Sequence, residues 1–326
     1  MFCYELTFKL QSGKTVSFKS TVNGRGLCLK GVFSIVSANV FAGDSTLTLI
    51  NPPFEYLGNG YQFDKAQVTL KAGMKKGFPN IRETYGTMAT GTVFYERPTS
   101  EGIENNLQFT FISTSDDVTR NITPIPVKES VKDIPVLYTL PWAKGVELKT
   151  ALLNCLSAWY DTKKIIIQIK DGLVNDSDKG IQYAHSIGGL ASIVRAMTRT
   201  PSYDGVSIYF DSGFIYITDF TKPPKKPAYK IGYGDIIGQP SLVENGDTVA
   251  IRVHSTALVA IGDTVEIPTK MIAAIESTTA AIAKKDRLNF KGKYHCIGIH
   301  HFVDSNESLD AAARSTVLIL RPNPNG

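Results

Sequence analysis

The alternation of hydrophobic and polar residues sets the character of the first third of the chain, residues 1–118. Leu6, Phe8 and Leu10 alternate with polar residues, and turn-forming residues at 11–14 separate this run from the next one. Such short alternating runs predict antiparallel strands joined by turns, which form one barrel or sandwich. The strands we expect are 6–10, 16–18, 31–40, 45–50, 66–72, 90–95 and 106–113, with a turn at 42–44 and a long loop over 73–89.

One connection in this unit is rich in aromatic residues. Asn51-Pro52-Pro53 ends a strand, because proline cannot donate a hydrogen bond to a neighbouring strand. A polar-aromatic segment from Phe54 to Phe63 follows, with Gly58-Asn59-Gly60 as its flexible point. The next strand then alternates from Ala66 to Ala72.

The hydrophobic period changes in the middle of the chain. Residues 119–141 contain widely spaced prolines, which predict an extended connection lying on the surface. Residues 142–220 then predict a small α+β unit. Its elements are a helix over 148–159, a strand at 165–167, a helix that starts at the N-cap Ser186 and runs through Met197, and a hairpin of 206–210 with 214–217.

Strands return after a spacer rich in proline and lysine at 221–234. In residues 235–326 we predict that strand 248–254 pairs with 263–267 through a turn at 261–263, and that strands 293–304 and 314–320 complete the unit. Residues 271–285 are rich in alanine and isoleucine and could form a helix. The fold class is therefore mainly β with an α+β insert between two antiparallel β units.

Composition indicates an ordinary folded protein. The chain has 326 residues, of which 43% are hydrophobic and 20% charged, and its net charge is +5. Its four cysteines form no CxxC pair, which favours buried thiols in a reducing compartment. The first residues predict no signal peptide. We expect no stable membrane insertion, since no apolar window approaches about 20 residues.

Motifs that could carry chemistry are incomplete. Gly13-Lys14-Thr15 lacks the first glycine of a phosphate-binding loop, and residues 232–238 have the wrong spacing for a dinucleotide site. Asp176–Gly180 resembles half of a calcium loop, but Ile187 stands where a carboxylate is needed. We therefore expect no catalytic residues, no cofactor and no bound metal.

Three histidines lie in one predicted strand together with a cysteine. Alternation would place His295 and His301 on one face, and Cys296 and His300 on the other, which makes a poor metal site. Pairs of carboxylates are plentiful enough that a glycosidase pair stays open as an alternative. The basic stretches at 75–76, 222–226 and 284–287 are expected on solvated loops, or on a surface facing another subunit or passing DNA.

Four stretches resemble the tail hub proteins of phages and related injection systems. They are the segment from Asn51 to Gly73, the helix–strand–helix–hairpin insert, the run DIIGQP at 235–240 followed by IGDTVEIP at 261–268, and FKGKYH at 290–295 with Asp304-Ser305. The resemblance covers most of the chain. It implies two tube-type β-barrels, one on each side of the α+β domain.

The resemblance also implies a function without chemistry. A homotrimer of such chains would form a pseudo-sixfold ring that joins the tail tube to a central spike in the virion, after synthesis in the host cytoplasm. Expected partners are the tail tube protein, the spike protein, other baseplate proteins, the tape measure protein and the genome DNA passing through the lumen. We expect the subunit contact at Phe54, Tyr56, Tyr61 and Phe63. The alternatives are a tail-tip module that binds the envelope or peptidoglycan, and a peptidoglycan hydrolase.

Overall fold

The computed structural model describes 15 segments of the chain, and the statements below concern these segments. They are residues 2–20, 28–36, 45–58, 62–75, 82–101, 104–112, 127–131, 134–176, 180–200, 202–211, 214–221, 226–243, 248–267, 292–305 and 313–322. The turn at 42–44 and the possible helix at 271–285 lie outside them.

The N-terminal unit consists of strands and one short helix. The elements are β1 (Phe2–Lys9), β2 (Thr15–Lys19), β3 (Cys28–Val36), β4 (Ser45–Ile50), α1 (Glu55–Gly58), β5 (Gln67–Met74), β6 (Gly86–Glu101) and β7 (Glu104–Ile112). All neighbours pair antiparallel, in the order β3-β4-β7-β6-β5-β1-β2. The predicted strands are confirmed over their described residues, whereas 37–40 and 113 lie outside these. One difference is that β6 is longer and begins inside the stretch that we expected to be a loop.

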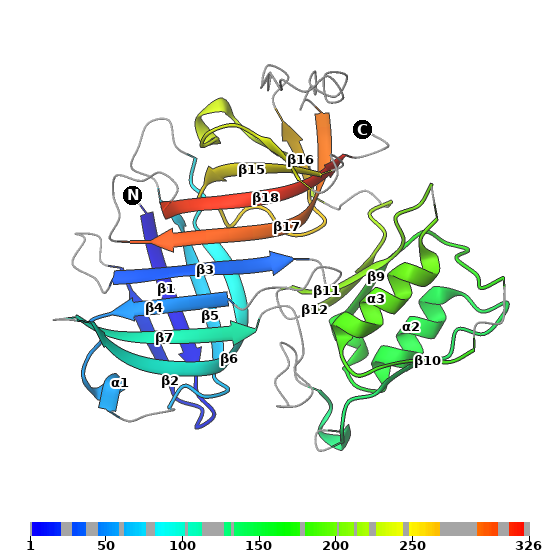
Figure 1. Ribbon diagram of the computed structural model, residues 1–326, viewed down its shortest axis with the longest axis horizontal. Helices are drawn as coiled ribbons and strands as arrows, with labels where there is room; N and C mark the ends of the chain where they lie inside the picture. Colours follow the sequence, from blue (N-terminus) through cyan, green and yellow to red (C-terminus); the bar gives the residue numbers. More distant parts are fainter. Residues whose placement is uncertain are drawn as a thin grey trace.

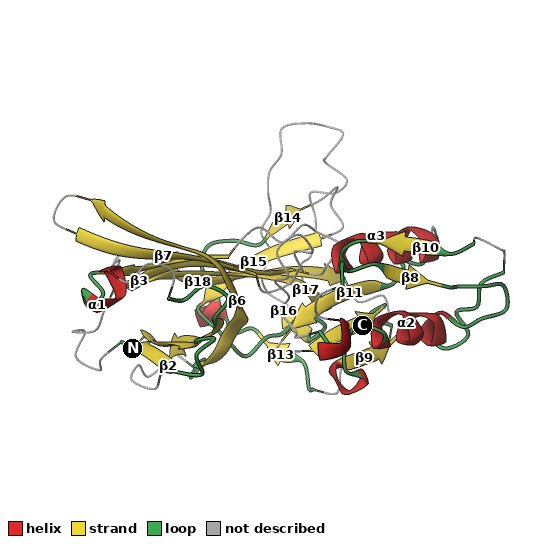
Figure 2. Ribbon diagram, turned by 90° about the horizontal axis from the view of Figure 1, so that it is seen from below, coloured by secondary structure: helices red, strands yellow, loops and turns green. Residues whose placement is uncertain are grey.

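The long strand β6 turns this sheet into two layers. Its first part, residues 86–92, pairs with β5, and its second part, residues 92–101, pairs with β7. The register shifts between Val93 and Tyr95, at the position where the strand changes layer. Figure 2 shows β6 curving between the layer that holds β2 and the layer that holds β3 and β7. The two layers enclose the core of the unit.

The middle unit has its own core. It contains a 3-10 turn at Glu129–Val131, β8 (Tyr138–Leu140), α2 (Leu148–Ser157), a 3-10 turn at Thr162–Lys164, β9 (Ile165–Gln168), β10 (Gln182–Ala184), α3 (Ile187–Thr198), β11 (Ser207–Asp211) and β12 (Phe214–Thr218). Figure 1 shows it to one side of the β units. Both predicted helices are confirmed. The N-cap is confirmed too, because the Ser186 side chain accepts a hydrogen bond from the Gly189 backbone at 3.0 Å.

One prediction for the segment that leads into this unit is wrong. Residues 119–141 were expected to lie on the surface, but Val136, Tyr138 and Leu140 are buried in the core of the middle unit. They belong to or adjoin β8, which pairs with β10. Proline spacing could not reveal this pairing, because the partner strand lies about forty residues further along the chain.

The C-terminal unit completes the architecture. Its elements are β13 (Tyr229–Lys230), a 3-10 turn at Tyr233–Asp235, β14 (Ser241–Val243), β15 (Thr248–His254), β16 (Thr264–Ile267), β17 (Gly292–Asp304) and β18 (Arg314–Pro322). The predicted hairpin between 248–254 and 263–267 is wrong. Strand β15 pairs with β14 and β18, whereas β16 pairs with β13 and β17, because residues 255–263 carry the chain across to the other edge of β17.

Strand β17 joins the two β units into one sheet. One of its edges pairs with β18 along the strand. Its other edge pairs first with β16, over residues 292–295, and then with β3, over residues 298–304. The described strands of the two β units thus form one 13-stranded sheet over a shared hydrophobic core. They do not close into a barrel, since β2 and β14 stand at the ends of the order.

Candidate functional site

The aromatic connection begins with a backbone clamp against β7. Asn51 has a left-handed backbone, with φ at +51°, and its backbone NH donates to the carbonyl of Asn105 at 2.7 Å. The Asn51 side-chain oxygen accepts from the backbone NH of Asn105 at 3.0 Å. These two bonds end β4 and direct the chain into α1, where Phe54 accepts from the backbone NH groups of Leu57 and Gly58.

Beyond α1 the chain returns to the core through Phe63. This ring is fully buried and lies 4.8 Å from the ring of Phe8 and 5.2 Å from that of Phe109, which come from opposite layers. The backbone NH of Phe63 donates to the buried carboxylate of Glu96 at 2.8 Å. Phe63 therefore fixes the end of the connection to both layers of the N-terminal unit.

Three of the four residues predicted to contact a neighbouring subunit are described, and they occupy different environments. Phe63 belongs to the core of its own chain, and Tyr56 is half-buried with its ring 5.2 Å from that of Phe18. Tyr61 lies outside the described residues. Phe54 is 80% exposed, the largest exposure among the large hydrophobic residues of the described segments. The structure brings the rings of Tyr56 and Phe63 to 5.9 Å from each other, while Phe54 is the most exposed of the three described residues.

The histidines of β17 lie on faces that differ from those expected by simple alternation. The register with β18 shifts between Cys296 and Gly298, so one extra residue is inserted there. Cys296 and Ile299 both face the shared core as a result, and alternation then places His301 on that face. The His301 ring nitrogen Nδ1 lies 3.0 Å from the Thr316 hydroxyl, and burial lowers the pKa of His301 to about 3.

The end of β17 is fixed to β3 by the motif Asp304-Ser305. The Ser305 hydroxyl accepts from the backbone NH of Leu29 at 2.7 Å, and the Ser305 backbone NH donates to the Leu29 carbonyl at 2.8 Å. Asp304 forms an ion pair with Lys30 at 3.7 Å. This motif, which the sequence marked only as a family resemblance, therefore helps to hold the two β units together.

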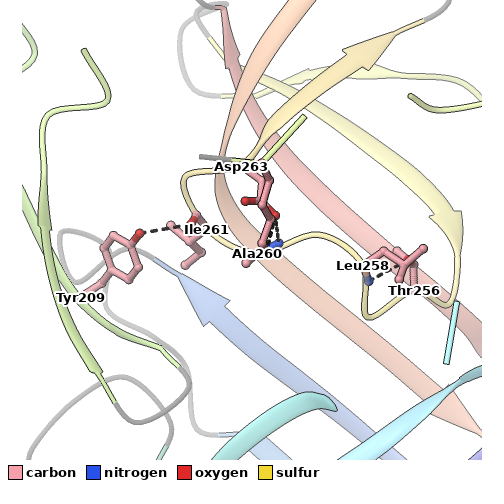
Figure 3. A network of polar contacts seen from close by, with 7 residues as sticks. Tyr209, Thr256, Leu258, Ala260, Ile261 and Asp263 are labelled. Atoms are coloured by element: carbon pink, nitrogen blue, oxygen red, sulfur yellow. Dashed lines mark hydrogen bonds and ion pairs between the residues drawn. The ribbon is translucent and has the colours of Figure 1, made fainter. Parts of the chain in front are cut away.

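A second joint connects the middle unit to the C-terminal unit. In Figure 3 the Tyr209 hydroxyl of β11 points toward the Ile261 carbonyl, to which it donates at 3.2 Å. The loop that presents this carbonyl is itself held by Asp263, whose side chain accepts from the Ala260 backbone at 2.9 Å. An ion pair between Asp204 and Arg321, at 3.2 Å, lies at the same joint. These contacts fix the orientation of the insert relative to the large sheet.

The described motifs and thiols that the sequence singled out occupy turns and core positions. Gly13-Lys14-Thr15 lies in the β1–β2 turn, as predicted, and no group of three potential metal ligands occurs among the described residues. Cys3, Cys155 and Cys296 are buried thiols, and burial raises the pKa of Cys155 to about 12. Within the described residues, no helix has the length and apolar character needed to cross a membrane.

Comparison with known proteins identifies the class of fold. No protein-family model and no curated protein matches the chain. Among solved structures, a tail protein from Neisseria meningitidis MC58 is similar with a TM-score of 0.52 and 10% identity, covering 98% of this chain and 97% of that one. The 43 kDa tail protein of prophage MuSo2 from Shewanella oneidensis gives a TM-score of 0.50 and 11% identity, covering 97% of both chains. The chain has the fold of phage tail proteins, and the resemblance found in the sequence is confirmed at that level.

Proposed function

We propose that this chain is the structural hub of a phage tail or a phage-like tail, with no catalytic role. The observation that carries the proposal is the similarity to two tail proteins along nearly the full length of both chains. Residues 1–118 and 235–326 would be its two tube-type units, 142–220 its insert, and 119–141 and 221–234 the connections. Three chains with two β units each would make a pseudo-sixfold ring.

The ends of the large sheet support a ring of this kind. An edge strand presents unpaired backbone groups, and an open edge on a separate molecule invites aggregation. Strands β2 and β14 stand at opposite ends of the sheet and differ in sequence. If the β2 edge of one chain pairs with the β14 edge of the next, the contact between the two chains is head-to-tail. Contacts of this type close into a ring when the rotation between neighbours permits it. Closure of the β-barrels would then occur between chains, with Phe54 contributing to the contact.

The partners follow from this position in the particle. The ring would contact the tail tube protein above and the central spike protein below, with other baseplate proteins around it. Its lumen would admit the tape measure protein and the genome DNA. The protein would be made in the host cytoplasm and would remain in the virion tail.

Native mass spectrometry of the purified chain tests the proposal. We expect a species of three chains that forms at micromolar concentration and dissociates on dilution. A chain that stays monomeric across the whole concentration range, with or without the tube protein, would contradict the hub assignment.

A second candidate function is favoured by one surface of the middle unit. Leu137, Ile181 and Tyr183 are exposed at or beside the β8–β10 ribbon, and Tyr183 is 56% exposed. Exposed apolar side chains grouped in this way are typical of binding surfaces. This surface supports an envelope-binding or peptidoglycan-binding tail-tip module. Co-sedimentation of the monomeric chain with isolated cell envelopes, lost in a Tyr183→Ser variant, would favour that function over the hub.

A further inference from the structure

The net charge of the chain is concentrated in one small part of the sheet. The described segments that hold β1, β2 and β5, residues 2–20 and 67–75, contain five lysines and a single carboxylate side chain, Glu5. Their side chains therefore carry a net charge of +4, out of +5 for the whole chain. Elsewhere 30 basic residues stand against 29 acidic ones, so the rest of the protein is nearly neutral.

Strand register places three of these lysines and Glu5 on one outward face. Glu5 lies between Lys19 of β2 and Lys71 of β5. Two outward-facing rows further along β1, Lys9 lies between Thr15 and Gln67. The row between them consists of Ser17, Thr7 and Thr69. The neighbouring strand β6 adds Thr87 opposite Lys71 and Thr90 opposite Thr69. We call this set of outward side chains the lysine–threonine face.

The side chains of this face indicate which kind of partner it can bind. None of these outward side chains is aliphatic or aromatic, whereas the buried centre of a protein–protein interface is usually apolar and depleted in charge. One aromatic ring borders the face, that of Tyr85, which lies 4.5 Å from the Lys75 ammonium, and a single ring provides no row of stacking platforms for successive single-stranded bases. What the face offers is hydroxyl donors and ammonium groups, which suit phosphate oxygens.

We infer that the lysine–threonine face binds the phosphate backbone of double-stranded DNA, without reading its sequence. Assigning that DNA to a tail genome rests on the proposed function, but the binding itself is a property of a single chain. Electrostatic contacts of this kind are weak at physiological salt and permit sliding along the duplex. Such a surface could therefore accompany DNA that moves past it without stopping it.

The one acidic group on the face provides a sharp test. The Glu5 carboxylate accepts a hydrogen bond from the Lys19 ammonium at 2.8 Å, and this bond, with Lys71 and Lys75 nearby, lowers the pKa of Glu5. Glu5 stays ionised and offsets part of the positive potential. Replacing it by glutamine should strengthen DNA binding, whereas neutralising a lysine of the face should weaken it.

The experiment measures fluorescence anisotropy of a labelled random-sequence duplex over a range of salt concentrations. Each lost phosphate contact should reduce the slope of log K against log salt by about 0.9. We expect Lys71→Gln to weaken binding several-fold and to lower the slope by about that amount, and Glu5→Gln to shift both in the opposite direction. The control is Lys149→Gln on α2, which removes another exposed lysine away from the face and should leave binding unchanged.

Three outcomes would overturn the inference. They are no salt-dependent binding by the unmodified chain, an equal loss in Lys149→Gln and Lys71→Gln, and binding of polyglutamate as tight as that of DNA, which would indicate an acidic protein as the partner. Native mass measured on the same samples separates this result from the hub proposal. A monomer that shows the expected pattern supports the face and contradicts the ring, whereas a trimer that ignores DNA contradicts the face alone.

Discussion

Substitution of Phe54 by serine tests the proposed subunit contact most directly. The ring is 80% exposed in the isolated chain. A subunit contact that buries it would therefore gain most of the hydrophobic free energy of a fully buried phenylalanine side chain. Full burial of such a side chain stabilises by about 1.5–3 kcal/mol, so each contact loses about 1–2.5 kcal/mol in the variant. Folding of the monomer should change little, because the side chain makes few contacts within its own chain.

A ring of three chains contains this contact three times, which makes the effect on assembly large. The total loss is about 3–7.5 kcal/mol, and the concentration for half-assembly varies with the square root of the trimer dissociation constant. It should therefore rise by about 10- to 600-fold. Native mass spectrometry over a dilution series measures this shift, and thermal unfolding of the dilute monomer serves as the check on folding.

A matched variant separates the contact from general surface hydrophobicity. Tyr95→Ser removes another exposed ring, 48% exposed on β6, and should leave the assembly concentration unchanged. The reasoning is refuted if Phe54→Ser assembles at the same concentration as the unmodified chain, or if both variants lose assembly equally.

Two further predictions concern stability. Gly73→Ala should cost about 2–5 kcal/mol in urea unfolding, because φ is +137° and a Cβ would lie 2.5 Å from the Thr84 carbonyl oxygen. Gly13→Ala, at φ +82° with no atom within 4 Å, should cost only about 1–2 kcal/mol, and equal losses would contradict the steric argument. Acid should also destabilise the fold through His301, whose pKa is about 3 in the folded chain against 6.5 when unfolded. Between pH 3 and pH 6.5 the His301 imidazole is protonated in the unfolded chain but not in the folded one. The contribution of neutral His301 to the free energy of unfolding is therefore complete above pH 6.5, and about 4 kcal/mol of it is lost as the pH falls toward 3. His301→Gln should flatten that part of the stability curve, and an unchanged pH dependence would show that His301 does not titrate in this way.

Local sequence signals predicted those elements whose partners lie nearby. The β1–β2 hairpin, both helices and the β11–β12 hairpin depend on alternation, helical spacing and turn residues within about twenty positions, and all of them are confirmed. Elements whose neighbours are distant were predicted less well. Strand 264–267 looked like the partner of 248–254, but it pairs with β17, and nothing in residues 255–263 reveals that crossing.

The faces of β17 were mispredicted for a related reason. A single inserted residue between Cys296 and Gly298 reverses the alternation beyond it, and this insertion accompanies the change of partner from β16 to β3. Alternation also could not show that Phe63, which we expected at the subunit contact, packs against Phe8 and Phe109 within its own chain. The lysine–threonine face shows the reverse case. Its outward residues follow from alternation in each strand, but only the register of β1 against β2 and β5 brings the charges into rows.

The pairing of β3 with β17 has a consequence for the order of events during protein synthesis. Leu29 and Ser305, which are bonded in the folded chain, are separated by 276 residues. At about 5–20 residues per second, a ribosome needs about 14–55 s to make the intervening chain. During that interval β3 can pair with β4, but its other edge has no partner from the same chain. The free edge of β3 is therefore covered only after β17 has been synthesised. Premature release of the nascent chain would leave that edge exposed to other molecules.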